Sequence, residues 1–206
     1  MAMAQTKPTI GVQAGISNSS IKGDAASGFN DLLDYTDGYI TTNSKNGFYA
    51  GINASIPLSE SISVQPGLQF TQKGYEMKGE MAIKGAEFLS PNAKATLTLN
   101  YIDVPVLLKA NLNGLELFAG PQVSYLASAD LKTTASVVGF NLYKNTFDAT
   151  EQLNRWDAGI KAGVGYQFEN GLNLHAAYDM GLMKTDANQN MDAYNRSLQV
   201  GIGFRF

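Results

Sequence analysis

The sequence predicts an all-β chain in which eight antiparallel strands run up and down around a barrel. Three observations support this prediction. Apolar and polar residues alternate along eight segments with a period of two, the pattern of strands that have one apolar and one polar face. No segment keeps a helical period for more than a turn or two. Long and short connections alternate, which puts four long loops at one end of the barrel and three tight turns at the other.

The eight predicted strands cover residues 7–21, 46–58, 62–77, 95–111, 115–130, 155–168, 172–185 and 195–206. In the last strand, an apolar row from Leu198 to Phe206 alternates with a polar, glycine-rich row from Ser197 to Arg205. Tight turns are expected at residues 59–61, 113–114 and 170–171, and the last two are Asn-Gly pairs, a strong hairpin signal. The long connections are expected at 22–45, 78–94, 132–152 and 186–194, although residues 135–143 could extend a hairpin.

Composition limits the class of protein. A chain of 206 residues needs only one domain, which we place at residues 5–206. Residues 1–4 (Met-Ala-Met-Ala) fit either the end of a signal peptide or a cloning remnant. A net charge of −3 and the lack of a basic tract argue against a nucleic-acid partner. The chain has no cysteine, which excludes disulfides and thiolate metal sites, and no apolar run approaches the roughly 18 residues of a spanning helix.

The direction of the apolar faces separates two architectures. A soluble, lipocalin-like lipid carrier keeps its apolar face inside, whereas an outer-membrane barrel turns it toward lipid. The polar faces mix glycine with both signs of charge, which suits a crowded interior, and the apolar faces carry almost no charge. Eight strands enclose only enough room for side chains, so we interpret the charged residues as a structural network that fills the lumen. The predicted lumen residues are Asp103, Lys109, Glu116, Asp157, Lys161, His175, Asp179 and Arg205.

Aromatic residues lie near the ends of the apolar faces. Trp156 and Tyr166 are ten residues apart on one face, which corresponds to a height of about 25 Å on a tilted strand, the height of an apolar band between two aromatic girdles. The predicted girdle residues are Phe48, Tyr125 and Tyr178 on the side of Trp156, and Phe168, Phe204 and Phe206 on the side of Tyr166. The sequence thus favours a monomeric barrel in the lipid of a bacterial outer membrane, with long loops extracellular and tight turns periplasmic.

Several segments resemble one family throughout the chain. They are residues 10–15 (IGVQAG), 65–74 (QPGLQFTQKG), 100–109 (NYIDVPVLLK), 117–125 (LFAGPQVSY), 177–182 (AYDMGL) and 203–206 (GFRF). In these segments the chain resembles the PorT-like outer membrane protein beta-barrel family, often labelled porin family, of bacteria of the Bacteroides–Flavobacterium type. The resemblance implies an eight-stranded outer-membrane barrel without a defined activity. It also implies that the terminal Phe206 is the aromatic C-terminus recognised by the outer-membrane assembly machinery.

The sequence offers little catalytic chemistry, and we expect no enzyme, cofactor or metal site. His175 is the only histidine, lies on the polar face and has no adjacent serine to activate. Asp31, Asp34 and Asp37 recur at every third position, which differs from an EF-hand loop, so a solvated loop is favoured over weak calcium binding. Phe140, Tyr143 and Phe147 in the third long connection fit a hairpin that packs on itself, with a recognition patch as the alternative.

Two functions remain open for such a barrel. The first is a structural or interaction role, through the surface loops or as a subunit beside other envelope proteins. The alternative is a narrow channel for ions or small solutes. A soluble lipid carrier is the least favoured possibility.

Overall fold

The computed structural model describes residues 7–22, 38–81, 92–137, 140–185 and 193–206. These residues form nine strands and one short 3-10 helix. The strands are β1 (Thr9–Lys22), β2 (Gly38–Pro57), β3 (Ile62–Met81), β4 (Asn92–Leu112), β5 (Leu115–Val137), β6 (Phe140–Asp148), β7 (Trp156–Gln167), β8 (Leu172–Gly181) and β9 (Tyr194–Arg205), and the helix is η2 (Thr150–Gln152). Within the described ranges, no helix is long and apolar enough to cross a membrane.

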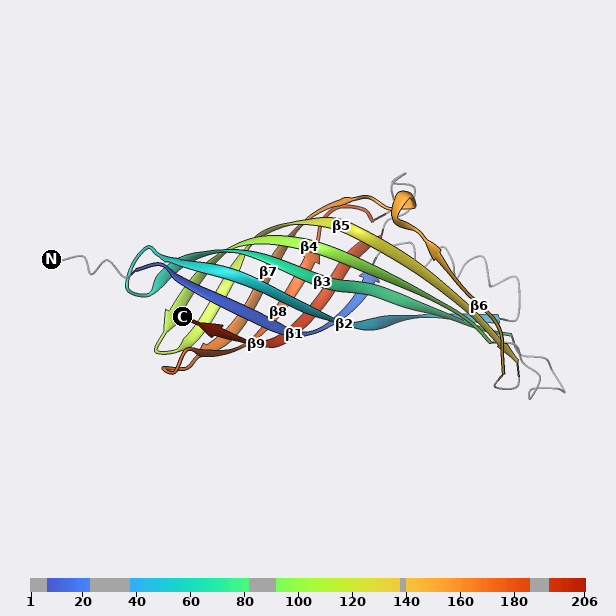
Figure 1. Cartoon of the computed structure of the whole chain (residues 1–206), viewed down its shortest axis with the longest axis horizontal. Helices are drawn as coiled ribbons and strands as arrows, with labels where there is room; N and C mark the ends of the chain where they lie inside the picture. The colour runs from blue at the N-terminus through green and yellow to red at the C-terminus, as the bar shows by residue number, and fades with distance from the viewer. Residues whose placement is uncertain (1–6, 23–37, 82–91, 138–139, 186–192) are drawn as a thin grey trace.

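Eight of the strands close into a ring, as Figure 1 shows. Each strand is antiparallel to its neighbours, and β1 pairs with both β2 and β9, so the first and last strands complete the circle. The register of this closure runs from Gly11 opposite Arg205 to Lys22 opposite Tyr194. β6 pairs with β5 and lies outside the ring. The predicted all-β, up-and-down antiparallel architecture is confirmed.

Three short connections link β2 to β3, β4 to β5, and β7 to β8, and antiparallel order places all three at the same end. Asn113 and Gly114 both have positive φ, 52° and 93°, which a two-residue hairpin turn of this kind requires. Gly171 has a φ of 89° in the β7–β8 turn. Three of the predicted long loops, 22–45, 78–94 and 186–194, fall largely outside the described residues, and so do residues 1–4 and the acidic positions Asp31, Asp34 and Asp37. The predicted loop at 132–152 is described except for residues 138–139.

One wall of the barrel is taller than the rest, and here the predicted strand boundaries were wrong. The pairing of β1 with β2 stops at Ser19 opposite Lys45, whereas the pairing of β2 with β3 continues to Gly38 opposite Met81. Residues 38–45, 78–81, 92–94 and 131–137, expected in or beside loops, are therefore strand. β5 and β6 form the hairpin extension that residues 135–143 suggested. Strands β2 to β6 form this tall wall, which extends toward the right in Figure 1.

The apolar residues of the ring face outward. Ile16 is 69% exposed and its neighbour Ser17 only 1%. In β9, Val200 and Ile202 are about half exposed while Gln199 is buried. Exposure of such an apolar exterior to water is unfavourable, whereas its contact with lipid is favourable. This orientation excludes the lipocalin-like carrier, in which the apolar face would lie inside.

Aromatic side chains on the outer face form small clusters near both ends of β7. Tyr125 and Trp156 pack edge to face at 5.0 Å between ring centroids, on neighbouring strands. On the turn side, Tyr166 packs on Phe168 at 4.9 Å, and Phe204 packs on Phe206 at 5.2 Å. Phe48 contacts Phe70 on the adjacent strand, at 5.6 Å. Tyr178 pairs in register with Ala162, so it lies between the two levels of β7 rather than beside Trp156.

Candidate functional site

The lumen is the candidate site, because the inward-facing residues of all eight ring strands converge there. Alternation along each strand directs every second side chain inward. All the predicted lumen residues lie on this inner face: Asp103, Lys109, Glu116, Asp157, Lys161 and Asp179 are buried, and His175 and Arg205 are partly buried. The lumen has three parts: a cluster of polar side chains near the turns, a polar network in the middle, and an apolar upper end.

The turn-side cluster is built around Glu116 at the start of β5. Its carboxylate accepts hydrogen bonds from the Lys109 Nζ at 2.9 Å, the Arg205 Nη2 at 2.8 Å and the Asn173 Nδ2 at 2.7 Å. The four side chains come from β4, β5, β8 and β9. A buried carboxylate is costly without such charge-assisted partners, and this one has two cations and an amide. The cluster joins strands that are distant in the sequence.

His175 lies next to this cluster and has both ring nitrogens occupied. Nδ1 lies 2.9 Å from the Asn173 Oδ1, and Nε2 lies 2.6 Å from the Tyr49 hydroxyl. Because the Asn173 oxygen can only accept, Nδ1 carries a proton and donates to it, while Nε2 is bonded to the Tyr49 hydroxyl. Neither nitrogen is free to activate a serine. The arrangement fits the structural role expected for His175.

A chain of amides and charges crosses the middle of the lumen. The Gln13 Nε2 donates to Gln69 at 2.8 Å, and the Gln69 Nε2 donates to the Gln199 Oε1 at 3.2 Å. The same Gln199 oxygen accepts from the Lys161 Nζ at 2.8 Å, and the Gln199 Nε2 donates to Asp179 at 2.7 Å. Lys161 and Asp179 also form an ion pair at 3.4 Å. These contacts connect β1, β3, β7, β8 and β9 across the barrel.

The two remaining predicted carboxylates lie farther from the turns. Asp103 accepts a hydrogen bond from the Thr71 hydroxyl at 2.6 Å and pairs with Lys73 at 3.4 Å. Asp157 is held by hydrogen bonds from the Asn195 side chain, at 3.2 Å, and from the backbone N–H of Met183, at 3.3 Å. Asp157 is thus bound by an amide and a backbone group, where the sequence suggested an opposite charge.

Sequence reasoning missed several members of this network. Lys73 and Thr71 continue the inward row of β3 that Gln65 and Gln69 begin, so extending the same phase by four residues would have found them. The buried Tyr49 likewise lies on the inward row of β2. The prediction considered charged residues and His175, whereas much of the network is made of amides and hydroxyls.

The lumen becomes apolar on the side opposite the turns. A buried cluster there contains Leu97, Leu99, Tyr101, Leu126 and Ala129. The connection between β6 and β7 packs against it through Ala149 and Leu153 and is fixed by two hydrogen bonds to Ala129, at 2.8 and 2.9 Å. The sequence carried no clear signal for this apolar end, because these residues alternate with the same period as the lipid-facing rows.

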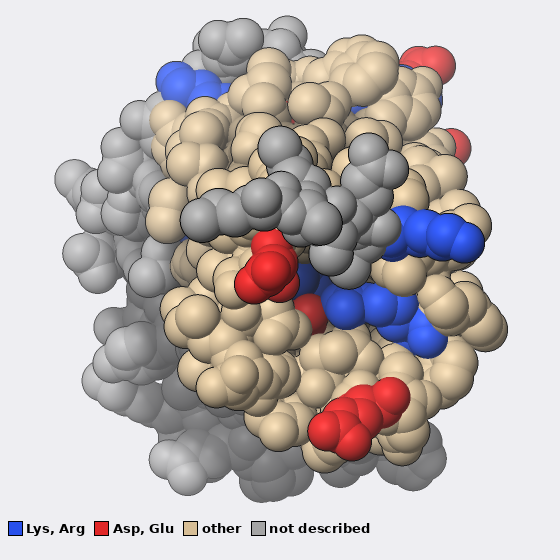
Figure 2. Space-filling view, turned by 90° about the vertical axis from the view of Figure 1, so that its left-hand side faces the viewer, with Lys and Arg blue, Asp and Glu red and all other residues tan. Residues whose placement is uncertain are grey.

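Little free space remains inside. A cavity of about 40 Å³ lies at the turn-side mouth, and one of about 10 Å³ lies beside Lys73, Asp157 and Asp179. A cavity must have a volume of roughly 10–15 Å³ to hold one water molecule. Figure 2 looks onto the turn-side end, where basic side chains are visible at the hollow. In the described structure the lumen is filled by its own side chains.

Comparison with known proteins gives one family and several similar folds. A family model described as outer membrane protein beta-barrel domain matches residues 3–187. A search of curated proteins finds no match. The crystal structure of Neisserial surface protein A (NspA) is 14% identical and has a TM-score of 0.52, with 98% of this chain and 100% of that chain covered. Its similarity supports the fold alone.

Two further solved structures are similar at a lower level. Ail, the attachment invasion locus protein of Yersinia pestis, was crystallised with the heparin analogue sucrose octasulfate; it is 14% identical, with a TM-score of 0.48 over 98% of this chain and 100% of that chain. The outer membrane protease OmpT of Escherichia coli is 10% identical, with a TM-score of 0.40 over 100% of this chain and 99% of that one. Neither similarity is strong enough to transfer a function.

Proposed function

We propose, from the premise that this chain belongs to the outer membrane protein beta-barrel domain family, that it is a small, closed barrel with an interaction role in the envelope. Family membership places it in the bacterial outer membrane. In this proposal the tight turns are periplasmic, the opposite end is extracellular, and the monomeric barrel serves other envelope components rather than passing solutes.

The filled lumen is the observation that supports a closed barrel. Buried ion pairs and amides span its lower and middle parts, and at its upper end the cluster from Leu97 to Ala129 on β4 and β5 is buried beneath the β6–β7 connection. An eight-stranded ring has room for side chains and little else. A narrow channel remains the second candidate, because the polar inner face runs continuously from Glu116 to Asp157.

The tall wall is the observation that supports an interaction role. Strands β2 to β6 extend beyond the last pairing of β5 with β7, at Tyr125 and Trp156, where the upper aromatic cluster lies. On β6, Lys144, Thr146 and Asp148 are exposed. Such a wall, standing above the lipid, offers a rigid surface for another envelope protein.

Conductance across a planar bilayer tests whether the barrel is closed. We expect the purified protein to insert and to show no steady open level. As a matched control, the double substitution Lys161→Ala and Gln199→Ala should empty the middle of the lumen and raise the frequency of openings. A stable, ohmic open level of the unaltered protein would favour the channel and contradict the closed barrel.

Crosslinking from the tall wall tests the interaction role. Because the chain has no cysteine, a single Thr146→Cys substitution allows a photoreactive group to be attached on β6 alone. We expect crosslinks in native outer membranes to a defined set of envelope proteins. The matched position is Ser59→Cys, at the opposite end, which should give a different set. Identical crosslinks from both positions, or none from β6, would argue against the tall wall as the contact surface.

A further inference from the structure

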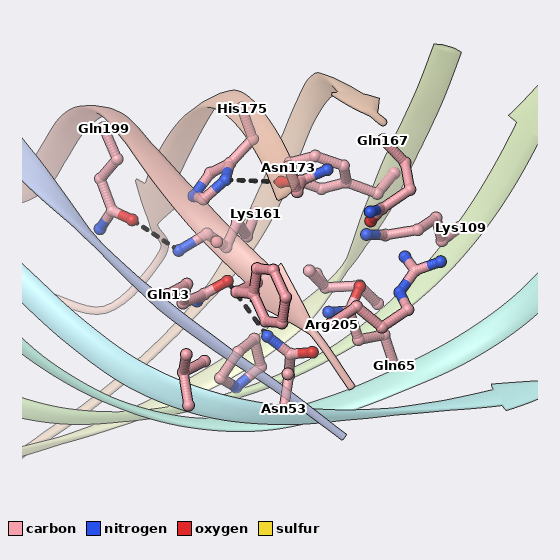
Figure 3. A pocket seen from close by; sticks show the side chains of 17 residues that line it. Gln13, Asn53, Gln65, Lys109, Lys161, Gln167, Asn173, His175, Gln199 and Arg205 are labelled. Carbon is pink, nitrogen blue, oxygen red and sulfur yellow. Dashed lines mark hydrogen bonds between the residues drawn. The ribbon is translucent and has the colours of Figure 1, made fainter. Parts of the chain in front are cut away.

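The turn-side mouth contains a hollow that the network leaves unfilled. Its volume is about 40 Å³, and its lining combines apolar side chains such as Leu107 and Phe118 with polar side chains of the inner face, among them Gln65, Lys109, Lys161, His175 and Arg205 (Figure 3). We propose that this hollow is a binding site for a small oxyanion, and that a carboxylate is the group that fits it best.

The balance of charge around the hollow favours an anion. Lys109 and Arg205 share one carboxylate, that of Glu116, so these three groups together keep one positive charge. Lys161 is balanced by its own partner, Asp179. A hollow with a low-dielectric wall strengthens the attraction of such an excess charge for a ligand of opposite sign.

Arg205 provides the geometry for recognition. Only its Nη2 is bonded to Glu116, at 2.8 Å, and its other guanidinium donors bond to no group in the described ranges. The side chain is 29% exposed, so it is open to a ligand from the turn side. In Figure 3 its guanidinium lies beside Lys109. A planar guanidinium with free donors matches the two oxygens of a carboxylate.

Gln65 supplies an independent observation that points to a missing partner. It lines the same hollow and is only 8% exposed, yet its Oε1 has no hydrogen-bond partner among the described residues. A buried carbonyl oxygen without a donor is costly, and an oxyanion cannot donate to it in this orientation. Rotation of the amide by half a turn presents its NH₂ group to an oxyanion, since the two orientations have the same shape.

The volume of the hollow limits the size of the ligand that it can hold. Its volume corresponds to about three water-sized positions, which is close to the size of an acetate ion. A larger molecule would place only its terminal carboxylate in the hollow and extend out through the open side. Phosphate, with more oxygens and a tetrahedral shape, should fit less well.

The single histidine makes the test direct. His175 lines the hollow, so the NMR signal of its Cε1–H reports on that place alone. The full chain in detergent micelles, at constant pH and ionic strength, is titrated with sodium acetate, sodium phosphate and the neutral isostere acetamide. We expect a saturable shift with acetate, a weaker one with phosphate and none with acetamide. Equal responses to acetate and acetamide would overturn the proposal.

Two substitutions with opposite effects sharpen the test. Arg205→Gln should weaken acetate binding about tenfold or more, as expected for the loss of a charged hydrogen-bonding partner. Glu116→Gln removes the competing carboxylate and should tighten binding. Lys94→Gln, which removes an exposed lysine on the tall wall, should leave the affinity unchanged. Arg205→Lys, which keeps the charge but not the planar fork, should bind with intermediate affinity. Unchanged binding by Arg205→Gln, or weaker binding by Glu116→Gln, would contradict the assignment.

Discussion

Lys73 is a single inward-facing side chain on which we expect the stability of the barrel to depend strongly. It is 3% exposed, pairs with Asp103 and lies over the ring of Tyr101, 4.9 Å from its centroid. Removing one member of a buried ion pair leaves the other charge without compensation. An exposed pair contributes far less, because water and salt screen it.

The substitution Lys73→Met tests this difference. We expect it to lower the free energy of unfolding by about 3–5 kcal/mol, because Asp103 keeps only the hydrogen bond from Thr71. Lys94→Met, which breaks the exposed pair with Glu76, should cost less than about 1 kcal/mol. Urea unfolding in lipid vesicles, followed by the fluorescence of the single Trp156, measures both. Equal losses would contradict a buried network that holds the barrel.

Glycine on the inner face makes room for large side chains. A Cβ atom on Gly201 would meet the Tyr49 hydroxyl and the backbone oxygen of Ala14. We expect Gly201→Ala to displace Tyr49 from His175 and to destabilise the barrel by about 1–3 kcal/mol. Gly67→Ala is the matched control, because the nearest atoms to its Cβ would lie at 3.3 and 3.4 Å. For each variant, the temperature at which the barrel unfolds is measured from the change in its mobility on a gel after heating. A similar decrease of this temperature in the two variants would contradict this packing.

The carboxyl group of Asp148 should make the stability of the β6–η2 junction depend on pH. Asp148 lies at the end of β6, where hydrogen bonds from the Thr150 hydroxyl and from the Thr150 backbone N–H lower the pKa of its carboxyl below the ordinary 3.8. The ionised carboxylate therefore stabilises the β6–η2 junction above that value, and the stabilisation disappears as pH falls through the lowered pKa.

Hydrogen exchange of the Thr150 amide measures this effect. We expect its protection, corrected for intrinsic exchange, to decrease between about pH 5 and about pH 2. In Asp148→Asn the protection should not depend on pH in this range. Asp130→Asn, at the position opposite Asp148 on β5, should keep the dependence. A pH-independent protection in the unaltered protein would rule out the role of Asp148.

At the scale of elements, the strands within the lipid could be predicted and those above it could not. In β9, one face meets lipid and the other the lumen, so apolar and polar residues alternate strictly. On β6, which lies outside the ring, the residues from Lys144 to Asp148 are exposed or half-exposed on both faces, and in the upper part of β2 the sequence Thr41-Thr-Asn-Ser44 loses the alternation. Threonine and aromatic residues in β6 retain a preference for strand, which is why a hairpin extension could still be suggested there.

The last residue of the chain illustrates how an element closes the ring. The backbone N–H of Phe206 donates to Ile10 at 2.9 Å, and its ring packs on Phe204 while remaining 71% exposed. We expect deletion of Phe206 to reduce insertion into the outer membrane severalfold, measured as the heat-modifiable fraction in isolated membranes. Phe206→Tyr, which keeps the aromatic ring, should insert normally. Normal insertion of the deleted form would contradict a role as the assembly signal.

At the scale of the whole molecule, the ring, its order and the outward direction of its apolar faces follow from period-two alternation and connection lengths. The contacts between side chains in the lumen cannot be predicted in this way. Alternation predicts that Glu116 and Arg205 face inward, but it does not predict that they form an ion pair. That contact depends on the registers that link β5 to β9 through β7 and β8, which are fixed only when the ring closes. The apolar upper lumen was likewise beyond sequence reasoning, since Leu97 and Leu99 have the same pattern as residues that face lipid.

The central claim is that one row of each strand faces lipid and the other faces a filled lumen. Single cysteines along β9, in a chain that otherwise has none, can each carry a bimane label in vesicles that contain doxyl-labelled lipids. We expect strong quenching at positions 198, 200, 202 and 204 and weak quenching at 197, 199 and 203. Uniform quenching along the strand, or the opposite alternation, would contradict it.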